Sequence, residues 1–160
     1  MLTWNEFAAV RPDLAEVGRA RFYQVPVGLG FLATVRADGR PRVRPICPLL
    51  TPRGLFAFLI PSPKRADLLR DGHFELHSFP TDDNEDAFSV TGRAERRDDP
   101  DLREECAQTW FAERGLDGPS PPGFDEEQLF EFLVDGCLST KTTGYGDYAP
   151  QHTVWKLGDS

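Results

Sequence analysis

The sequence predicts a mainly β domain with flanking α-helices, of the α+β class. Short apolar stretches with β-type alternation follow one another from residue 28 onward and are joined mostly by tight turns. Two helical segments precede them, and two capped helical segments interrupt them. A length of 160 residues, 39% hydrophobic residues and twelve phenylalanines suit a single core. We therefore treat residues 1–160 as one barrel or sandwich domain, with a helical leader over 1–23 and the β-strands with their inserted helices over 28–160.

The leader begins with "TWNE", in which Thr3 and Glu6 have the spacing of a capping box. This motif predicts a short helix that ends near Val10. Pro12 then closes the first helix and opens a second amphipathic one.

The clearest hairpin comprises "LGFLATVR", the turn "ADGR" and the returning strand "RPRVRPICPLL". Asp38 and Gly39 predict a type I′ turn, because both residue types tolerate positive φ. The next strand, "LFAFLI", is apolar on both faces, which indicates a strand that is covered on both sides.

Four more strands are expected at "HFELHSF", "DAFSVTGRAERR", "LFEFLVDGCLST" and "HTVWKL". One inserted helix starts with Ser62 as N-cap and Pro63 at the first helical position, and stops at Gly72. A second starts with Asp99 as N-cap and ends at Gly115.

The charge of the chain is unevenly distributed. The formal net charge of -8 argues against binding to nucleic acid or to an anionic membrane. Residues 31–65 nevertheless contain seven basic and one acidic side chain, whereas the remainder contains 11 basic and 25 acidic ones. This concentration predicts a site for a small anion, and the alternative is a solvated face compensated by distant acids.

Two parts of this basic segment are suited to bind an anion. Arg42 and Arg44 are two apart on a strand, so they project from one face and repel each other unless a negative group lies between them. Lys64 and Arg65 occupy the first turn of a helix, where basic residues are unfavourable unless an anion sits on the cap beside Ser62. In the alternative interpretation these side chains extend into solvent.

Other chemistry has little support in the sequence. His73, Glu75 and His77 alternate onto one strand face, but no fourth ligand is evident, so we expect a barrel face and no metal site. The three cysteines form no C-x-x-C pair and are expected to be reduced, with mostly packing roles. Neither a nucleophile elbow nor a signal peptide nor an apolar span of ~20 residues is present, which predicts a cytoplasmic protein.

The order of these motifs resembles the pyridoxamine 5′-phosphate oxidase-like, FMN-binding split-barrel family. The resemblance is carried by "LATVRADGRPRVRPI", "LFAFLIPSPKRADLLRDGHFELHS", "FSVTGRAERRDDPDLRE" and "VWKLG", and the leader resembles that of actinobacterial-type members. It implies a six-stranded split barrel and a homodimer with the cofactor at the subunit interface. It also implies cofactor binding by the residues at the family's positions, which are Arg42, Arg44, Pro45, Ile46, Ser62 and Lys64.

Two departures from the family pattern argue against pyridoxamine 5′-phosphate oxidation itself. "RVRPICPL" stands where the oxidase has R-x-V-L-L-K, and Pro63 replaces the arginine of S-R-K. The leading hypothesis is an FMN-dependent oxidoreductase of unknown substrate, with the phosphate on Ser62, Lys64 and Arg44, Arg42 assisting, and the flavin ring along Pro45 and Ile46.

Three alternatives remain open. The same barrel could use an 8-hydroxy-5-deazaflavin, whose polyanionic tail would suit Arg36, Arg40 and Arg65. It could also be a non-catalytic flavin or haem binder, for which His73 and His77 are the residues of interest, or a nucleic-acid module, which the overall charge disfavours. The sequence names no catalytic residue, and substrate choice is expected to reside in loops such as "DGPSPPGFDEE" and "GYGDYAPQ".

Overall fold

The computed structural model describes residues 1–158. Its helices are α1 (Trp4–Val10), α2 (Pro12–Phe22), α3 (Pro63–Arg70), α4 (Pro100–Glu113) and the short 3-10 helix η1 (Phe124–Glu126). Its strands are β1 (Gly30–Val35), β2 (Pro41–Ile46), β3 (Leu49–Thr51), β4 (Gly54–Leu59), β5 (His73–Ser78), β6 (Ala87–Arg97), β7 (Gln128–Lys141) and β8 (Gln151–Lys156).

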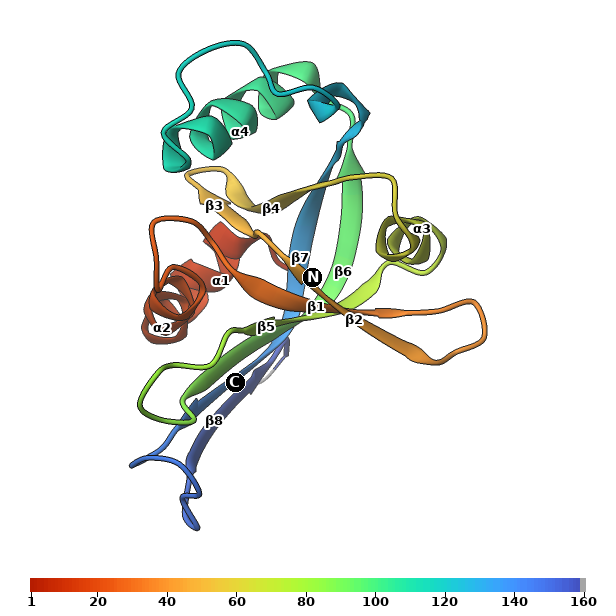
Figure 1. The fold of residues 1–160 in the computed structure, drawn as a ribbon. Coiled ribbons are helices and arrows are strands. Elements are labelled where there is room, and N and C mark those ends of the chain that lie inside the picture. The colour runs from red at the N-terminus through yellow and green to blue at the C-terminus, as the bar shows by residue number, and fades with distance from the viewer. Residues whose placement is uncertain (159–160) are drawn as a thin grey trace.

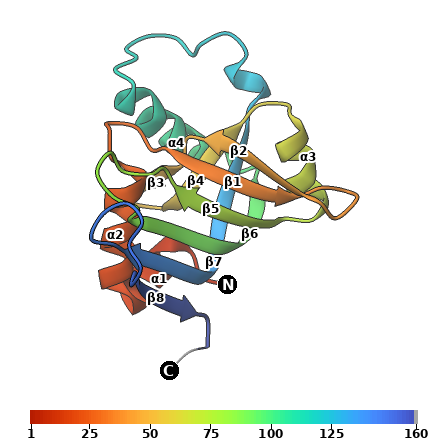
Figure 2. The ribbon, with the colours of Figure 1, turned by 60° about the horizontal axis from the view of Figure 1, so that its bottom comes forward.

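The strands form one antiparallel sheet in the order β2-β1-β5-β6-β7-β4-β3, with β8 paired to the far half of β7 (Figures 1 and 2). This open, coiled sheet with flanking helices confirms the predicted split-barrel class. It contains eight strands rather than the six expected. The predicted strand "RPRVRPICPLL" divides at Cys47 and Pro48 into β2 and β3, which lie at opposite ends of the strand order.

A bulge bends the two longest strands. The β6–β7 register shifts between Thr91 and Gly92, and Gly92 has φ 156°. A Cβ atom at Gly92 would lie 1.8 Å from the carbonyl oxygen of Leu133, so only glycine allows this approach.

The predicted type I′ turn at Asp38 and Gly39 is wrong. Gly39 has φ 81°, but Asp38 does not take a positive φ. The Gly39 N–H donates to the Arg36 carbonyl and the Arg36 N–H donates to the Arg40 carbonyl, which is the pattern of a type I turn closed by a glycine bulge.

The core has two parts. Helices α1 and α2 cover one side of the sheet and bring Trp4, Phe7 and Phe22 against Phe88 and Trp155. A smaller cluster lies beneath α4. Strand β4 is buried along its whole length, with Leu55 in the main core and Phe56 in the smaller cluster, so the prediction of a strand covered on both sides is confirmed.

The helix starts follow the sequence signals. Thr3 and Glu6 form the complete capping box, and the Asp99 carboxylate accepts from the N–H groups of Asp101 and Leu102. Within residues 1–158, none of the helices has the length and apolar character needed to cross a bilayer.

Candidate anion-binding site

A small basic hollow lies between the edge strand β2 and the start of α3. It is lined by Arg42, Arg44, Ser62, Pro63 and Lys64 and has a volume of about 120 Å³. Ligand pockets for whole small molecules measure ~300–1,000 Å³. The hollow therefore suits one phosphate or carboxylate group rather than an entire nucleotide.

Arg42 is held from below by a buried acid. Its Nε donates to Asp67 Oδ2 at 2.7 Å, and Asp67, which is 4% exposed, also accepts from Thr34 Oγ1 at 2.9 Å and Arg70 NH1 at 3.2 Å. Burial by itself raises the pKa of the Asp67 carboxyl, but the hydrogen bonds from Arg42, Thr34 and Arg70 outweigh it and hold the pKa below its ordinary value. Because the bond uses Nε, the two terminal nitrogens of Arg42 remain for a ligand.

Lys64 and Arg44 bring a second and a third positive charge. Lys64 Nζ donates to the carbonyl of Pro45 at 3.5 Å, and an Arg44 terminal nitrogen donates to the carbonyl of Val43 at 2.8 Å. Burial lowers the pKa of the Lys64 ammonium; Cys47 and Glu127 offset part of that lowering, and the Arg44 guanidinium adds to it. An anion placed between Lys64 and Arg44 would relieve their repulsion.

The N-terminus of α3 adds backbone donors. Ser62 is the N-cap, as predicted, but its hydroxyl donates to the carbonyl of Ile60 at 2.9 Å and accepts no N–H of the helix. Pro63 has no N–H, so the free donors of the first turn are those of Lys64 and Arg65. Two backbone N–H groups are thus available beside the cationic side chains.

The other predicted residues lie outside the hollow. Pro45 is exposed on the edge strand, whereas Ile46 is 6% exposed and packs in the main core. Arg40 pairs with Asp38 at the hairpin tip, and Arg65 donates to the carbonyls of Leu59 and Glu126.

Arg36 and Arg53 do not line the hollow either. The Nε of Arg36 is buried without a hydrogen-bond partner among the described residues, and Arg53 pairs with Glu105. The basic segment 31–65 therefore does not form one continuous cationic surface.

The histidines of β5 are exposed on its outer face, as the alternation predicts. His73 Nδ1 lies 2.7 Å from an Asp71 carboxylate oxygen, and His77 Nδ1 lies 2.6 Å from the Ser78 carbonyl. All three cysteines are free.

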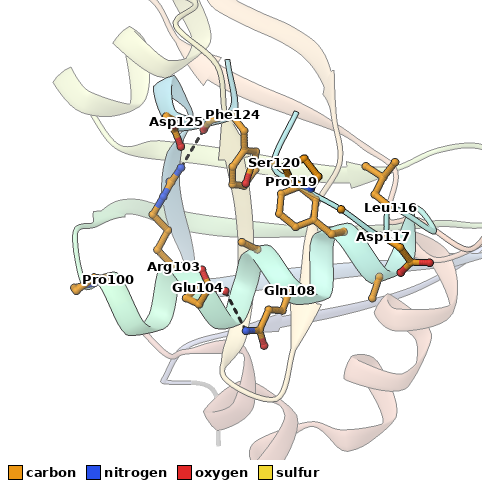
Figure 3. Close-up of a pocket in the computed structure, with 14 residues that line it drawn as sticks. Pro100, Arg103, Glu104, Gln108, Leu116, Asp117, Pro119, Ser120, Phe124 and Asp125 are labelled. Carbon is orange, nitrogen blue, oxygen red and sulfur yellow. Dashed lines mark hydrogen bonds between the residues drawn. The ribbon is translucent and has the colours of Figure 1, made fainter. Parts of the chain in front are cut away.

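A larger hollow lies between α4 and the loop that follows it (Figure 3). Arg103 is the cation in its lining, and it stacks against Phe58 and Phe124 while donating to the carbonyls of Phe124 and Glu127. Arg103 therefore ties the loop to the helix. The basic hollow on β2, in contrast, has three cationic side chains in its lining, and it is the candidate anion site.

Sequence reasoning missed Asp67, Thr34 and Arg70, which form the support of Arg42. The basic segment ends two residues before Asp67, so the charge count excluded the one acid that matters locally. The sequence did contain a signal for the Asp67–Arg70 pair. Asp67 lies three residues before Arg70 on a short helix, so the two side chains lie on the same side of that helix.

The chain thus combines a split barrel with a basic hollow between its edge strand β2 and the N-terminus of α3. A sequence model of the pyridoxamine 5′-phosphate oxidase family matches residues 25–140. The chain belongs to that family. No curated protein matches it.

Solved structures share this fold at low identity. A candidate 5-nitroimidazole antibiotic resistance protein from Bacteroides thetaiotaomicron is 14% identical, with a TM-score of 0.62, over 76% of this chain and 80% of its own. A candidate pyridoxamine 5′-phosphate oxidase from Listeria innocua is 17% identical, with a TM-score of 0.60. The match covers 76% of this chain and 94% of the Listeria chain. A heme binding protein from Mycobacterium smegmatis is 16% identical, with a TM-score of 0.60, over 86% of this chain but only 56% of its own. These likenesses establish the fold and leave the ligand open.

Proposed function

We propose that this protein is an FMN-dependent oxidoreductase whose basic hollow holds the phosphate of the flavin. The observation that carries the proposal is the convergence of Arg42, Arg44 and Lys64 with the uncapped start of α3 on a hollow of about 120 Å³. Helix N-termini with free N–H groups and adjacent cations are suited to phosphate.

Each group of the hollow has a distinct task. Lys64 and Arg44 neutralise the phosphate charge, the Lys64 and Arg65 N–H groups donate to its oxygens, and Arg42, fixed by Asp67, completes the far side. Ser62 joins them only if its hydroxyl turns away from Ile60. Pro45 borders the exposed edge along which we place the flavin ring.

When bound, the flavin supplies hydride chemistry at its ring, so the chain itself needs no nucleophile. Its residues bind the cofactor and orient it toward the substrate. The family resemblance also implies a homodimer that binds the cofactor at the interface between its subunits. Two exposed apolar side chains at the β1–β2 end of the sheet support a covered face: Val35 and Val43, which are 36% and 51% exposed.

The alternatives fit the geometry less well. The arginines that would hold a deazaflavin tail are dispersed, since Arg40 pairs with Asp38 and Arg65 with backbone carbonyls. The heme binding neighbour favours a haem role, but His73 and His77 are four residues apart on a strand, about 13 Å, and cannot both ligate one iron. A haem iron could therefore be ligated by only one of these two histidines in each chain.

Titration of the protein with FMN, followed by the quenching of flavin fluorescence, tests the proposal. Lys64→Ala and Arg44→Ala should each weaken FMN binding about tenfold or more, because each removes a charge-assisted contact. Arg40→Ala is the matched control, since it removes an arginine from the same hairpin but outside the hollow. Unchanged FMN affinity in the Lys64 and Arg44 variants would show that the phosphate is held elsewhere.

A further inference from the structure

A second hollow lies on the outer face of the sheet, beneath the loop that follows β7. It has a volume of about 470 Å³, within the ~300–1,000 Å³ range of small-molecule pockets. Strand residues Phe31, His77 and Ala87 and loop residues Pro80 and Tyr145 contribute to its lining. We call it the Tyr145 hollow. It shares no lining residue with the basic hollow.

Hydrogen bonds fasten the loop after β5 to the loop after β7 at this hollow. The Tyr145 hydroxyl donates to the Thr81 carbonyl at 3.2 Å, and the Gly146 N–H donates to a Glu85 carboxylate oxygen at 2.9 Å. Asp86 accepts from the Thr142 N–H at 2.7 Å and pairs with Arg21 of α2 at 2.6 Å. The polar groups of the loops are thus used to hold the wall in place.

The aromatic surfaces remain open to a ligand. Tyr145 is 65% exposed although its hydroxyl is bonded, so most of its ring surface is accessible. Phe31 is stacked on Phe79, with ring centroids 4.4 Å apart and planes 22° apart, and this contact fixes the orientation of Phe31. Two positioned aromatic rings suit a flat aromatic partner.

His77 supplies one directional polar atom. A backbone carbonyl can only accept, so the 2.6 Å contact with the Ser78 oxygen assigns the hydrogen to Nδ1. Nε2 of the neutral ring is then a hydrogen-bond acceptor, and within residues 1–158 no side chain or backbone group donates to it. A matching ligand must therefore offer an N–H or O–H donor.

The acidic side chains of the lining disfavour anions. Glu85 and Asp86 are among the lining residues, and the lining contains no lysine or arginine. A carboxylate or phosphate ligand would meet repulsion here, in contrast to the basic hollow.

We propose that the Tyr145 hollow binds a planar, uncharged or cationic heteroaromatic molecule that stacks on Phe31 and Tyr145 and donates a hydrogen bond to His77 Nε2. The strand register places Phe31 beside Pro45, where we place the flavin ring. A role as the substrate site rests on the proposed function, whereas binding to the hollow does not.

The test is a titration of the full-length protein, with and without FMN, followed by ¹⁵N–¹H NMR. The probes are indole and benzofuran, which have the same shape but differ in the N–H donor. Indole should bind about three- to tenfold more tightly than benzofuran, and its shifts should centre on residues 77–87 and 142–147. Equal affinities, or shifts centred elsewhere, would overturn the proposal.

Four variants separate the contributions of Tyr145 and His77 to indole binding. Tyr145→Ala should weaken indole binding about two- to tenfold, whereas Tyr145→Phe, which keeps the ring, should retain it. Tyr148→Ala is the matched control, because Tyr148 lies in the same loop and is fully exposed outside the hollow. His77→Phe should abolish the preference for indole over benzofuran. An equal effect of the Tyr145→Ala and Tyr148→Ala changes would contradict the proposal.

FMN affinity measured on the same variants keeps the two proposals apart. Tyr145→Ala should leave FMN binding unchanged, and Lys64→Ala should leave indole binding unchanged. Competition between indole and FMN for one site would show that the hollow is not a separate site.

Discussion

Asp67 is the residue on which the geometry of the basic hollow depends most. It is the buried acid among several cations. It joins α3 to β1 through Thr34 and to β2 through Arg42, and it also accepts from Arg70 of its own helix. An arginine fixed through Nε presents its terminal nitrogens in one orientation, so less rotamer entropy is lost when an anion binds.

Replacing Asp67 with asparagine should destabilise the fold by about 2–3 kcal/mol, because two guanidinium groups lose their buried partner while Arg70 keeps some hydration. The folded-state pKa of Asp67 is lowered, so its contribution is complete above the ordinary value of 3.8 and is lost as the pH falls through the lower folded-state pKa. Urea unfolding of both proteins should therefore show a constant difference from pH 7 to about pH 4 and a smaller one below. A difference that vanishes already at pH 6 would contradict this assignment.

The cysteines differ in burial. Burial raises the pKa of Cys106 and of Cys137 to about 12, so neither forms thiolate at neutral pH. Cys47, after the end of β2, is only partly buried. Iodoacetamide at pH 8 should alkylate Cys47 alone in the native protein, as mass spectrometry of peptides would show. Comparable labelling of Cys106 or Cys137 would mean that the core opens readily.

At the scale of elements, the bulge at Gly92 controls the path of β6 and β7. These strands share the most extensive pairing in the sheet and carry β8, β4 and the α1–α2 layer. A straight β6–β7 pair could not bend the sheet into a split barrel.

Gly92→Ala should lower the free energy of unfolding by about 3 kcal/mol or more, because the new Cβ would meet the Leu133 carbonyl. Gly118→Ala is the matched control. Gly118 has a similar φ of 153°, but a Cβ added there would meet nothing within 4 Å, so about 1 kcal/mol of backbone strain is expected. Equal losses in thermal or urea unfolding would show that the close approach does not matter.

The elements were largely predictable because their signals are local. The Thr3 and Asp99 caps, the buried strand "LFAFLI" and the alternation of "HFELH" each depend on residues a few positions apart. The Asp38 turn was misassigned because Asp-Gly suits both a type I′ turn and a type I turn with a glycine bulge.

The break at Pro48 and the partner of Arg42 could not be read from the sequence, since both depend on contacts between distant strands. The same holds for the Tyr145 hollow, whose loops are joined by bonds such as that from Tyr145 to Thr81, 64 positions apart. The sequence indicated only that the loop "GYGDYAPQ" could contribute to substrate choice.

At the scale of the whole molecule, the outer face of the sheet is the candidate surface for dimer formation. Val43, Ala33, Glu75, Thr91 and Gly136 follow one another across five strands in register. The β1–β2 end of this face, with the exposed Val35 and Val43, is suited to burial against a second copy.

Sedimentation at micromolar concentration should therefore give about twice the chain mass of 18.0 kDa. Val43→Lys should shift this mass toward the monomer, because the ammonium group would be buried unpaired in a dimer. Leu69→Lys, an exposed apolar site on α3, is the control that should leave the mass unchanged. A wild-type monomer at these concentrations would exclude an interface cofactor site.

The central claim is that cations from β2 and the start of α3 hold the phosphate of a flavin. The most direct measurement compares the affinity of the wild-type protein for FMN and for riboflavin, which differ only in that phosphate. The proposed site predicts that FMN binds at least about tenfold more tightly than riboflavin, and that added salt reduces this preference. Equal affinities for the two flavins would contradict the account.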